Sequence, residues 1–362
     1  MTKNKKYKLL KYNPSQNQNG GFTYFTDILS KTYKIPKNLN DTHQVVADEN
    51  DRIVTDVLKY PTIDQINNMN EINIPTYTSG YHIDDLINYE SQLLQKNTIY
   101  NKPNVILLET YSIGCLKYLR EMQNTNKTVI MNFANAFKIC GAHYSSSAQE
   151  ETLCRSAPLL YYELSIYKKR EELENGNVEY TLYDPELYTN SSTNTINVTQ
   201  KWYDKILYTE NMDFIRDDYG NLLNEQLIAD IITVAALDRR YKFTGYNMTD
   251  QIYFDGIYKS LEATFLLPLK YGVKNIILGA WGLGVFENDE VIVIEGFINA
   301  IDKYGKYYDN IFFPLDSNWL NFFGFYLSKY SSGKIKNTNN MNLNLTGFPD
   351  PILNKIELPL CN

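Results

Sequence analysis

The stretch VIMNFANAFKICGAHYSSSAQEETLCRS, residues 129–156, predicts a strand, a loop and a helix in that order. Its first residues form a short apolar run without charge, which is typical of a strand buried on both faces. Further along, Leu153, Ala157, Leu160 and Leu164 recur at the three- and four-residue spacings of an amphipathic helix. Pro158 should kink this helix, because proline cannot complete the helical hydrogen bonds.

Two adjacent carboxylates, Glu150 and Glu151, stand at the start of that helix. Ser147 as N-cap and Glu150 three residues later fit a capping box, in which each side chain bonds the other residue's backbone N–H. This explains only one glutamate, since neighbouring helical residues point about 100° apart. A carboxyl group at a loop–helix junction can instead act as a general acid toward a glycosidic oxygen, provided that burial raises its pKa toward neutrality. The residues alone leave capping and catalysis open.

A second strand–loop–helix unit is predicted in NIILGAWGLGVFENDEVIVIEGF, residues 275–297. Its loop contains three glycines, Gly279, Gly282 and Gly284. Glycine lets a backbone come close to a ligand that a Cβ would keep at a distance. Free N–H groups before a helix suit phosphate or diphosphate. The glycine spacing does not match the dinucleotide fingerprint, and no P-loop lysine follows. A plain tight turn is the alternative.

The rest of the chain continues the alternation of strands and helices. Short apolar runs at 104–110, 128–134, 275–280 and 310–315 predict buried strands, while the run at 229–237 fits either a strand or a buried helix. Helices are predicted from about Thr249 to Tyr271, disturbed by Pro268, and after Asn288 or Asp289 as N-cap. The fold should therefore be α/β.

Polar stretches set the predicted boundaries. Residues 184–200 and the segment from Ser331 onward are rich in Asn, Ser and Thr, and both are predicted to be loops or disordered. We expect an N-terminal extension over 1–21, one domain over 22–330 and a polar tail over 331–362.

Composition limits the classes of partner. The 35 basic and 42 acidic residues give a net charge of −7, which argues against a large nucleic-acid or anionic-membrane footprint. No apolar run has the length of a membrane span or follows the basic start as in a signal peptide, so a soluble intracellular protein is expected. The cysteines Cys115, Cys140, Cys154 and Cys361 form no CxxC pair, so neither a disulfide framework nor a metal site is indicated, and no cofactor is expected.

Taken together, the two loops resemble a known family. The segments NFANA (132–136), QEETLCRS (149–156) and ILGAWGLGVFEND (277–289) resemble signature segments of the microbial-type poly(ADP-ribose) glycohydrolases, which are macrodomain proteins. Intervening segments such as ILYTENMDFIRDDYGNLL (206–223) and ADIITVAAL (229–237) follow in the family's order. The resemblance covers roughly residues 22–315.

The resemblance implies a macrodomain-like mixed sheet sandwiched between helices, with ADP-ribose held across the two loops. Glu151 would be the catalytic acid/base that protonates the departing ribose hydroxyl, and Glu150 would hold ribose hydroxyls. Gln149 would support the loop, and Asn135 would contact the distal ribose. The second phosphate loop would comprise Gly279, Ala280, Gly282, Leu283, Gly284, Val285 and Phe286, with Phe286 against the terminal ribose. The alternatives are a hydrophobic staple for Phe286 and a strand-end turn for Asn135.

The chain departs from the family pattern at two points. Cys140, Gly141 and Ala142, or Ile139 to Gly141 if the gap falls one residue differently, replace a run of three glycines that shapes the family's diphosphate pocket. Added Cβ atoms can narrow this pocket or disfavour positive φ. His143 follows and offers a new phosphate donor, or is simply solvated. The sequence ALD at 236–238 stands where the family tends to have Ala-Pro-Asn.

Three functions follow from these patterns. The first is a glycohydrolase that releases ADP-ribose from poly(ADP-ribose) or from modified proteins. The second is a reader that binds ADP-ribose, or another nucleotide, without turning it over. The third is a nucleic-acid binder that stacks bases on its tyrosines, which has little support because the negative charge comes without a basic stripe.

Overall fold

The computed structural model describes residues 43–74, 76–95, 103–175, 182, 188–190, 195–197, 204–240, 242–244, 250–331 and 344–346. The predicted N-terminal extension over 1–21 lies outside the described residues. Of the predicted tail over 331–362, only Ser331 and residues 344–346 are described. The domain boundaries at 22 and 330 stay predictions.

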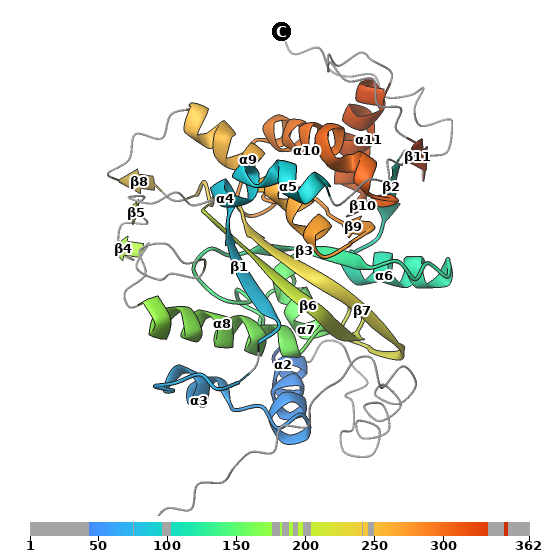
Figure 1. The fold of residues 1–362 in the computed structure, drawn as a ribbon. Helices are drawn as coiled ribbons and strands as arrows, with labels where there is room; N and C mark the ends of the chain where they lie inside the picture. Colours follow the sequence, from blue (N-terminus) through green and yellow to red (C-terminus); the bar gives the residue numbers. More distant parts are fainter. Residues whose placement is uncertain are drawn as a thin grey trace, which may run out of the picture.

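The described strands form an eight-stranded mixed sheet in the order β1-β6-β7-β3-β9-β10-β2-β11, which runs through the middle of the molecule (Figure 1). Its strands are β1 (Thr78–His82), β2 (Asn104–Glu109), β3 (Thr128–Ala134), β6 (Lys205–Arg216), β7 (Leu222–Ala235), β9 (Asn275–Ile277), β10 (Asn310–Leu315) and β11 (Asn344–Thr346). β1, β6 and β7 pair antiparallel, and all pairs from β7 to β11 are parallel. The four predicted strands are confirmed, and the ambiguous run at 229–237 belongs to strand β7.

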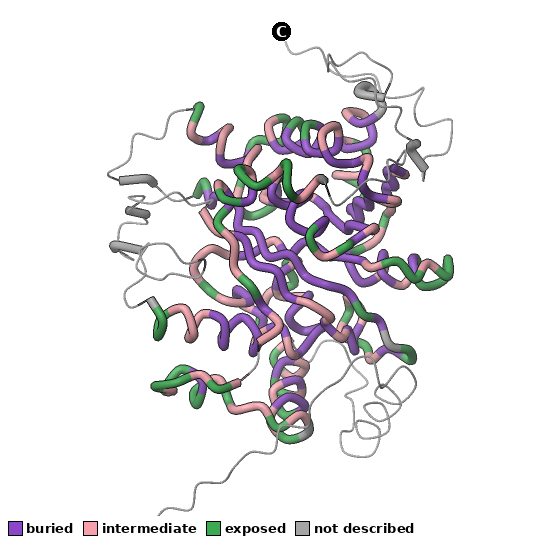
Figure 2. Tube along the Cα trace, in the orientation of Figure 1, coloured by how far each residue is buried: buried purple, intermediate pink, exposed green. Residues whose placement is uncertain are grey.

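Helices cover both faces of this sheet. The helices α6 (Ser112–Glu121), α7 (Gln149–Ser156) and α8 (Leu159–Asn175) pack on one face, while α4 (Ile83–Asn88), α9 (Asp250–Lys270), α10 (Glu290–Tyr304) and α11 (Ser317–Ser331) pack on the other. Successive side chains of β3 alternate between the two cores, with Val129 and Met131 on one side and Ile130 on the other. The sheet and the inner helix faces are accordingly buried (Figure 2).

The predicted helix ends agree with the structure at α9 and α10 and differ around Pro158. Asp289 caps α10 by accepting hydrogen bonds from the N–H groups of Val291 and Ile292, and α9 contains Pro268 near its end. The single kinked helix predicted around Pro158 is wrong, because α7 ends at Ser156 and α8 begins at Leu159. Ala157 leaves the helical conformation, as residues before proline tend to do.

The loop prediction is wrong within parts of both polar stretches. In 184–200, β4 (Tyr188–Asn190) and β5 (Thr195–Asn197) form a small sheet with β8 (Lys242–Thr244). In the tail, β11 adds a parallel strand beside β2 at the edge of the main sheet. Backbone pairing at a sheet edge needs no apolar side chains, so composition did not reveal these strands.

The first described segment packs beneath the sheet, close to α7 and α8 (Figure 1). It comprises α2 (His43–Arg52), the π-helical turn η1 (Ile53–Val57) and α3 (Ile63–Asn67). The remaining described elements are α5 (Glu90–Gln95) and the 3-10 turn η3 (Gly305–Tyr307). None of the described helices combines the length and the apolar composition that crossing a membrane requires.

Candidate functional site

The two glycine-containing loops leave the same edge of the sheet. Strands β3 and β9 are adjacent and parallel, with Thr128 opposite Asn275 and Ile130 opposite Ile277. The loops after their carboxyl ends, 135–148 and 278–289, are therefore neighbours at the edge where α/β proteins bind ligands. The second loop also packs closely on the end of β3, because a Cβ added at Gly279 would lie 2.7 Å from Cζ of Phe133.

Gln149, the first residue of α7, ties this helix to the end of β3. Its Oε1 accepts a hydrogen bond of 2.9 Å from the backbone N–H of Phe133. Its Nε2 donates to the carbonyl oxygen of Met131 at 2.7 Å and to Ser112 Oγ at 3.2 Å. The side chain thus fixes the start of α7 against both β3 and α6.

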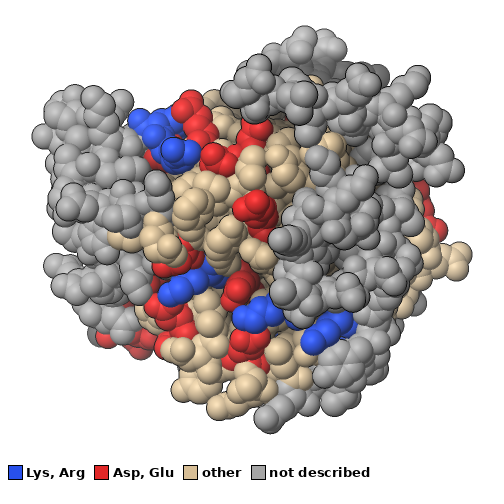
Figure 3. Space-filling model, turned by 90° about the horizontal axis from the view of Figure 1, so that it is seen from above, with Lys and Arg blue, Asp and Glu red and all other residues tan. Residues whose placement is uncertain are grey.

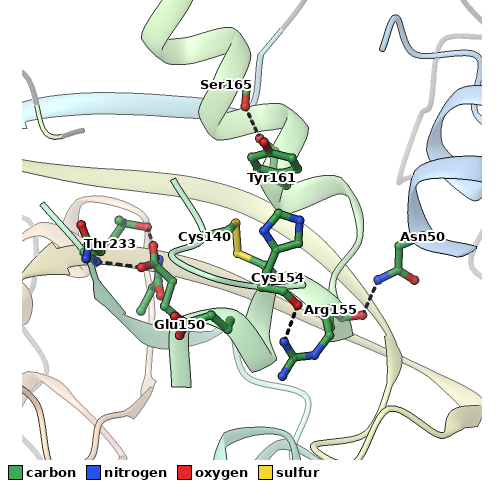
Figure 4. Close-up of a disulfide and its surroundings, with 12 residues drawn as sticks. Asn50, Cys140, Glu150, Cys154, Arg155, Tyr161, Ser165 and Thr233 are labelled. Carbon is green, nitrogen blue, oxygen red and sulfur yellow. Dashed lines mark hydrogen bonds between the residues drawn. A yellow bond between two sulfur atoms is a disulfide. The ribbon is translucent and has the colours of Figure 1, made fainter. Parts of the chain in front are cut away.

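Glu150 is a buried carboxylate directed at the strand end rather than at its own helix. Its Oε2 accepts a 2.7 Å hydrogen bond from the backbone N–H of Asn135, and Nδ2 of Asn132 lies 3.4 Å from its Oε1 (Figure 4). The predicted capping box is wrong: the N-cap of α7 is Ala148, which makes no side-chain cap bond, and Ser147 is exposed. The carboxylate of Glu150 is engaged by β3 instead.

Glu151 points in a different direction, as the helical geometry predicts. It is half-buried, and its Oε1 accepts a 3.0 Å hydrogen bond from the backbone N–H of Ala142. The contact with the loop is close, since a Cβ added at Gly141 would lie 2.3 Å from the same oxygen. Of the two glutamates, Glu151 therefore carries the more accessible carboxylate and faces the loop that replaces the glycine run.

That loop is covalently joined to α7, which overturns the prediction that no disulfide is present. Cys140 and Cys154 form a disulfide, and both residues are buried (Figure 4). Cys140 has a φ of 56° and Gly141 a φ of 50°, so two consecutive residues take the left-handed conformation. The Cys140 side chain is turned into the core, which leaves only its backbone to face a ligand.

His143 is neither solvated nor placed as a charged phosphate donor. It is 5% exposed and packs between Tyr144 and Tyr161, with ring centroids 4.0 and 4.6 Å away. Burial lowers its pKa to about 4, with smaller contributions from the positive charges of Arg155 and Lys138. The imidazole is therefore neutral near pH 7. Its carbonyl oxygen accepts a 2.6 Å hydrogen bond from Nη1 of Arg155.

Asn135 shapes the turn that follows β3. Its Oδ1 accepts hydrogen bonds from the backbone N–H groups of Phe137 at 2.9 Å and Lys138 at 3.0 Å. This is the strand-end turn that the sequence offered as the alternative. A contact of Asn135 with a ribose stays a prediction.

Two buried side chains hold the second loop in place, and part of the loop is exposed. Nδ2 of Asn288 donates to the carbonyl oxygens of Leu237 and Gly282, and Trp281, fully buried, donates from Nε1 to Val234. Both Gly279 and Gly282 have positive φ values, 151° and 72°, and both lack room for a Cβ. Of the other predicted contact residues, Leu283 is buried, Ala280 and Phe286 are half-buried, and Gly284 and Val285 are exposed.

Gly284 differs from the other two loop glycines. A Cβ added there would meet no atom within 4 Å, and φ does not lie in the left-handed region. Neither packing nor backbone conformation among the described residues requires glycine at this position. Open space above a glycine is what a backbone that receives a ligand needs.

Sequence reasoning missed an arginine beside the second loop. Arg240 donates from Nε and Nη2 to the two carboxylate oxygens of Asp238, at 2.8 and 2.6 Å, and its guanidinium lies 5.8 Å from the ring centroid of Phe286. Asp238 is the last residue of the ALD segment (236–238), which differs from the family pattern. The spacing Asp-x-Arg was the available signal, because residues two apart across a turn can pair.

Sequence reasoning also missed the disulfide and the contact of Arg155 with the first loop. Both Cys154 and Arg155 lie one helical turn after the two glutamates, at a spacing that places side chains on one face. Helical spacing alone places Cys154 near the face of Glu151, but the partner cysteine follows only from the folded loop. Cys115 is free and buried, and within the described ranges no group of His, Cys, Asp and Glu side chains is arranged to hold a metal ion.

Residues 60–191 match the family model described as microbial-type PARG, catalytic domain, where PARG stands for poly(ADP-ribose) glycohydrolase. This confirms the resemblance over a segment that contains both glutamates and the first loop. The second loop lies beyond the matched residues. No curated protein shows significant similarity to the chain in sequence.

Solved structures of poly(ADP-ribose) glycohydrolases have the same fold as this chain. The PARG of Thermomonospora curvata, bound to the inhibitor ADP-HPD, has a TM-score of 0.52 and 20% sequence identity, covering 75% of this chain and 92% of that one. The PARG of Deinococcus radiodurans, in complex with ADP-ribose, also has a TM-score of 0.52 and 20% identity, covering 68% of this chain and 93% of that one. The predicted macrodomain-like fold, a mixed sheet between helices, is confirmed.

Proposed function

We propose, from the premise that residues 60–191 resemble a microbial-type PARG catalytic domain, that the chain is an ADP-ribose glycohydrolase. Its substrate would be poly(ADP-ribose) or an ADP-ribosylated protein. The observation that carries the proposal is the placement of Glu151, a half-buried carboxylate held at the sheet edge where the loops after β3 and β9 meet.

In this proposal the diphosphate of ADP-ribose lies across the two loops, where glycine backbone can approach it closely. Glu151 in its protonated form donates its proton to the departing ribose oxygen. The resulting sugar has oxocarbenium character, and the neighbouring diphosphate stabilises its positive charge. The carboxylate of Glu151 then takes a proton from the attacking water, so one group serves as acid and base.

Glu150 has a supporting role in this mechanism. Its carboxylate already accepts the N–H of Asn135 at 2.7 Å, which places it under the end of β3. A carboxylate has about four lone-pair sites, so it can accept ribose hydroxyls as well as this N–H group. Gln149 holds the backbone on which both glutamates depend.

The loss of two loop glycines is the argument for a reader that binds without turnover. The loop conformation favours the glycohydrolase instead. Cys140 keeps a φ of 56°, a value that glycine adopts without penalty, and its Cβ is directed into the buried disulfide. Only Ala142 adds a side chain near Glu151, and its N–H still reaches the carboxylate.

Arg240 supplies a positive charge at the second loop. Its side chain is 41% exposed, and the paired carboxylate of Asp238, almost fully buried, fixes the orientation of the guanidinium. A guanidinium is always charged and presents planar, forked N–H donors that suit phosphate oxygens. We assign it to the diphosphate or the terminal ribose of the ligand.

A nucleic-acid binder is the least supported function. Seen from above, the described Lys and Arg residues lie in small groups beside Asp and Glu, and on this described surface they form no continuous basic stripe (Figure 3). The net charge of −7 points the same way.

The test is incubation of the protein with poly(ADP-ribose), with chromatographic detection of free ADP-ribose, alongside calorimetric titration of ADP-ribose. Release of ADP-ribose supports the glycohydrolase. Binding without release supports the reader, and neither binding nor release discards both. Electrophoretic retardation of single-stranded DNA tests the third function.

A further inference from the structure

We propose that the Cys140–Cys154 disulfide is a positioning element for catalysis, which keeps the Ala142 N–H on the Glu151 carboxylate. The inference rests on the proposed glycohydrolase function. It assigns a positioning role to two residues outside the reacting groups.

Three successive contacts fasten the loop to one face of α7. The disulfide holds residue 140, the carboxylate of Glu151 holds the N–H of residue 142, and Arg155 holds the carbonyl oxygen of residue 143 at 2.6 Å. Cys154 and Arg155 stand one turn after Glu151 on the same short helix. The carboxylate of Glu151 therefore lies on the same helix as a covalent and a charged attachment of this loop, and Figure 4 shows these two attachments at Cys154 and Arg155.

The covalent attachment holds a conformation that cysteine rarely adopts by itself. At a φ of 56° the Cβ of a non-glycine residue crowds the backbone, so an untethered Cys140 would tend to return to negative φ. Gly141 follows at 50°, and its Cα lies so close to Glu151 that a Cβ would come within 2.3 Å of Oε1. A rotation at residue 140 would therefore move the 142 N–H away from the carboxylate.

The hydrogen bond fixes where the Glu151 carboxylate lies relative to the loop. A catalytic group displaced by about 1 Å can lose on the order of 100-fold in rate. Removing the tether should then lower turnover, while ligand affinity, which the proposed function assigns largely to the second loop and Arg240, changes less.

Reduction of the Cys140–Cys154 disulfide removes the covalent link between the loop and α7. A dithiol transfers two electrons and two protons to the disulfide, giving the two thiols of Cys140 and Cys154, and is itself oxidised to a disulfide. Both cysteines are at most 3% exposed, so a reductant reaches them only when the loop opens. Reduction of the folded protein should accordingly be slow.

The test compares four proteins under non-reducing conditions: the wild type, Cys154→Ala, the double variant Cys140→Gly/Cys154→Ala, and Cys115→Ala as a matched control for loss of a buried cysteine. Each is assayed for kcat and KM on poly(ADP-ribose), with thermal melting as the check on folding. We expect Cys154→Ala to lower kcat roughly 10- to 100-fold with little change in KM. The double variant, in which glycine tolerates positive φ, should recover most of the kcat.

Equal kcat in the wild type and Cys154→Ala would overturn the inference and leave the proposed function intact. A wild type without turnover would overturn the proposed function, and the inference with it. Should Cys154→Ala fail to fold, the wild type assayed before and after full reduction by dithiothreitol gives the same comparison without a substitution. Unchanged kcat after reduction, with free thiols verified by mass spectrometry, would then overturn the inference.

Discussion

The backbone N–H of Ala142 donates a 3.0 Å hydrogen bond to Oε1 of Glu151, and so links the loop after β3 to the first turn of α7. This contact separates two adjacent glutamates that composition cannot tell apart. Glu150 is buried and bonded to the end of β3, whereas Glu151 is half-buried and faces the loop. In the proposed mechanism the first has a supporting role and the second carries the chemistry.

Gly141→Ala should displace the Glu151 carboxylate. A Cβ would lie 2.3 Å from Oε1, and alanine at a φ of 50° costs about 1–2 kcal/mol. We expect a loss of kcat of about 100-fold, larger than the accompanying loss of stability explains. Steady-state kinetics on poly(ADP-ribose), together with urea unfolding, measure the two effects. A variant that loses stability but keeps kcat would show that the carboxylate position is unimportant.

Gly284→Ala should affect ligand binding and nothing else. The added Cβ would meet no atom within 4 Å, so the melting temperature should stay within the error of the wild type. If ADP-ribose approaches this backbone, the same Cβ takes up space that the ligand needs, and Kd should rise about tenfold. Isothermal titration with ADP-ribose checks this. Unaltered affinity would remove Gly284 from the ligand contact surface.

Arg240→Ala should weaken ADP-ribose binding by about 1.5–3 kcal/mol, the range for a charge-assisted hydrogen bond. Arg239→Ala is the control, because the Arg239 guanidinium packs over Tyr253, 5.1 Å from the ring centroid. Titration in low and high salt adds a second readout, since a charge contact at an exposed side chain weakens with ionic strength. Equal effects of the two substitutions would argue against a specific role for Arg240.

His143 should make the protein less stable as the pH falls from about 6.5 to about 4. Its pKa is lowered from 6.5 to about 4 in the folded state, so in this window the unfolded chain binds the proton more readily. The stability is therefore present above pH 6.5 and is lost progressively below it. His143→Phe, which retains a ring between Tyr144 and Tyr161, should lack this loss.

Urea unfolding of both proteins at pH 7 and pH 5 measures the difference. Burial raises the pKa of the carboxyl groups of Asp51, Glu163 and Asp218, and their contribution has the opposite sign. These groups are common to both proteins, so they cancel in the comparison. An identical fall in stability for wild type and His143→Phe would contradict the assignment.

Local patterns predicted the strands that are buried on both faces, because a short uncharged apolar run such as 128–134 suits a strand that packs against helices on both sides. They also predicted the different directions of Glu150 and Glu151, which follow from helix geometry. The capping box failed because Glu150 has a stronger partner in the N–H of Asn135, 15 residues earlier.

The disulfide could not be inferred from spacing rules, since 14 residues separate its cysteines and no paired motif surrounds them. Its geometry depends on how the loop returns to α7, which is a tertiary property. The burial of His143 has the same origin, because Tyr161 belongs to α8 and meets the imidazole only in the folded chain.

The most direct test of the central claim is the turnover of poly(ADP-ribose) by Glu151→Gln under single-turnover conditions, with ADP-ribose affinity measured on the same preparation. The substitution keeps the size of the side chain and its acceptor oxygen for Ala142 but replaces the ionisable carboxyl group with an amide that cannot act as acid or base. We predict that the rate falls at least about 100-fold while Kd stays within about threefold of the wild type. A variant that releases ADP-ribose at the wild-type rate would show that Glu151 is not the acid/base.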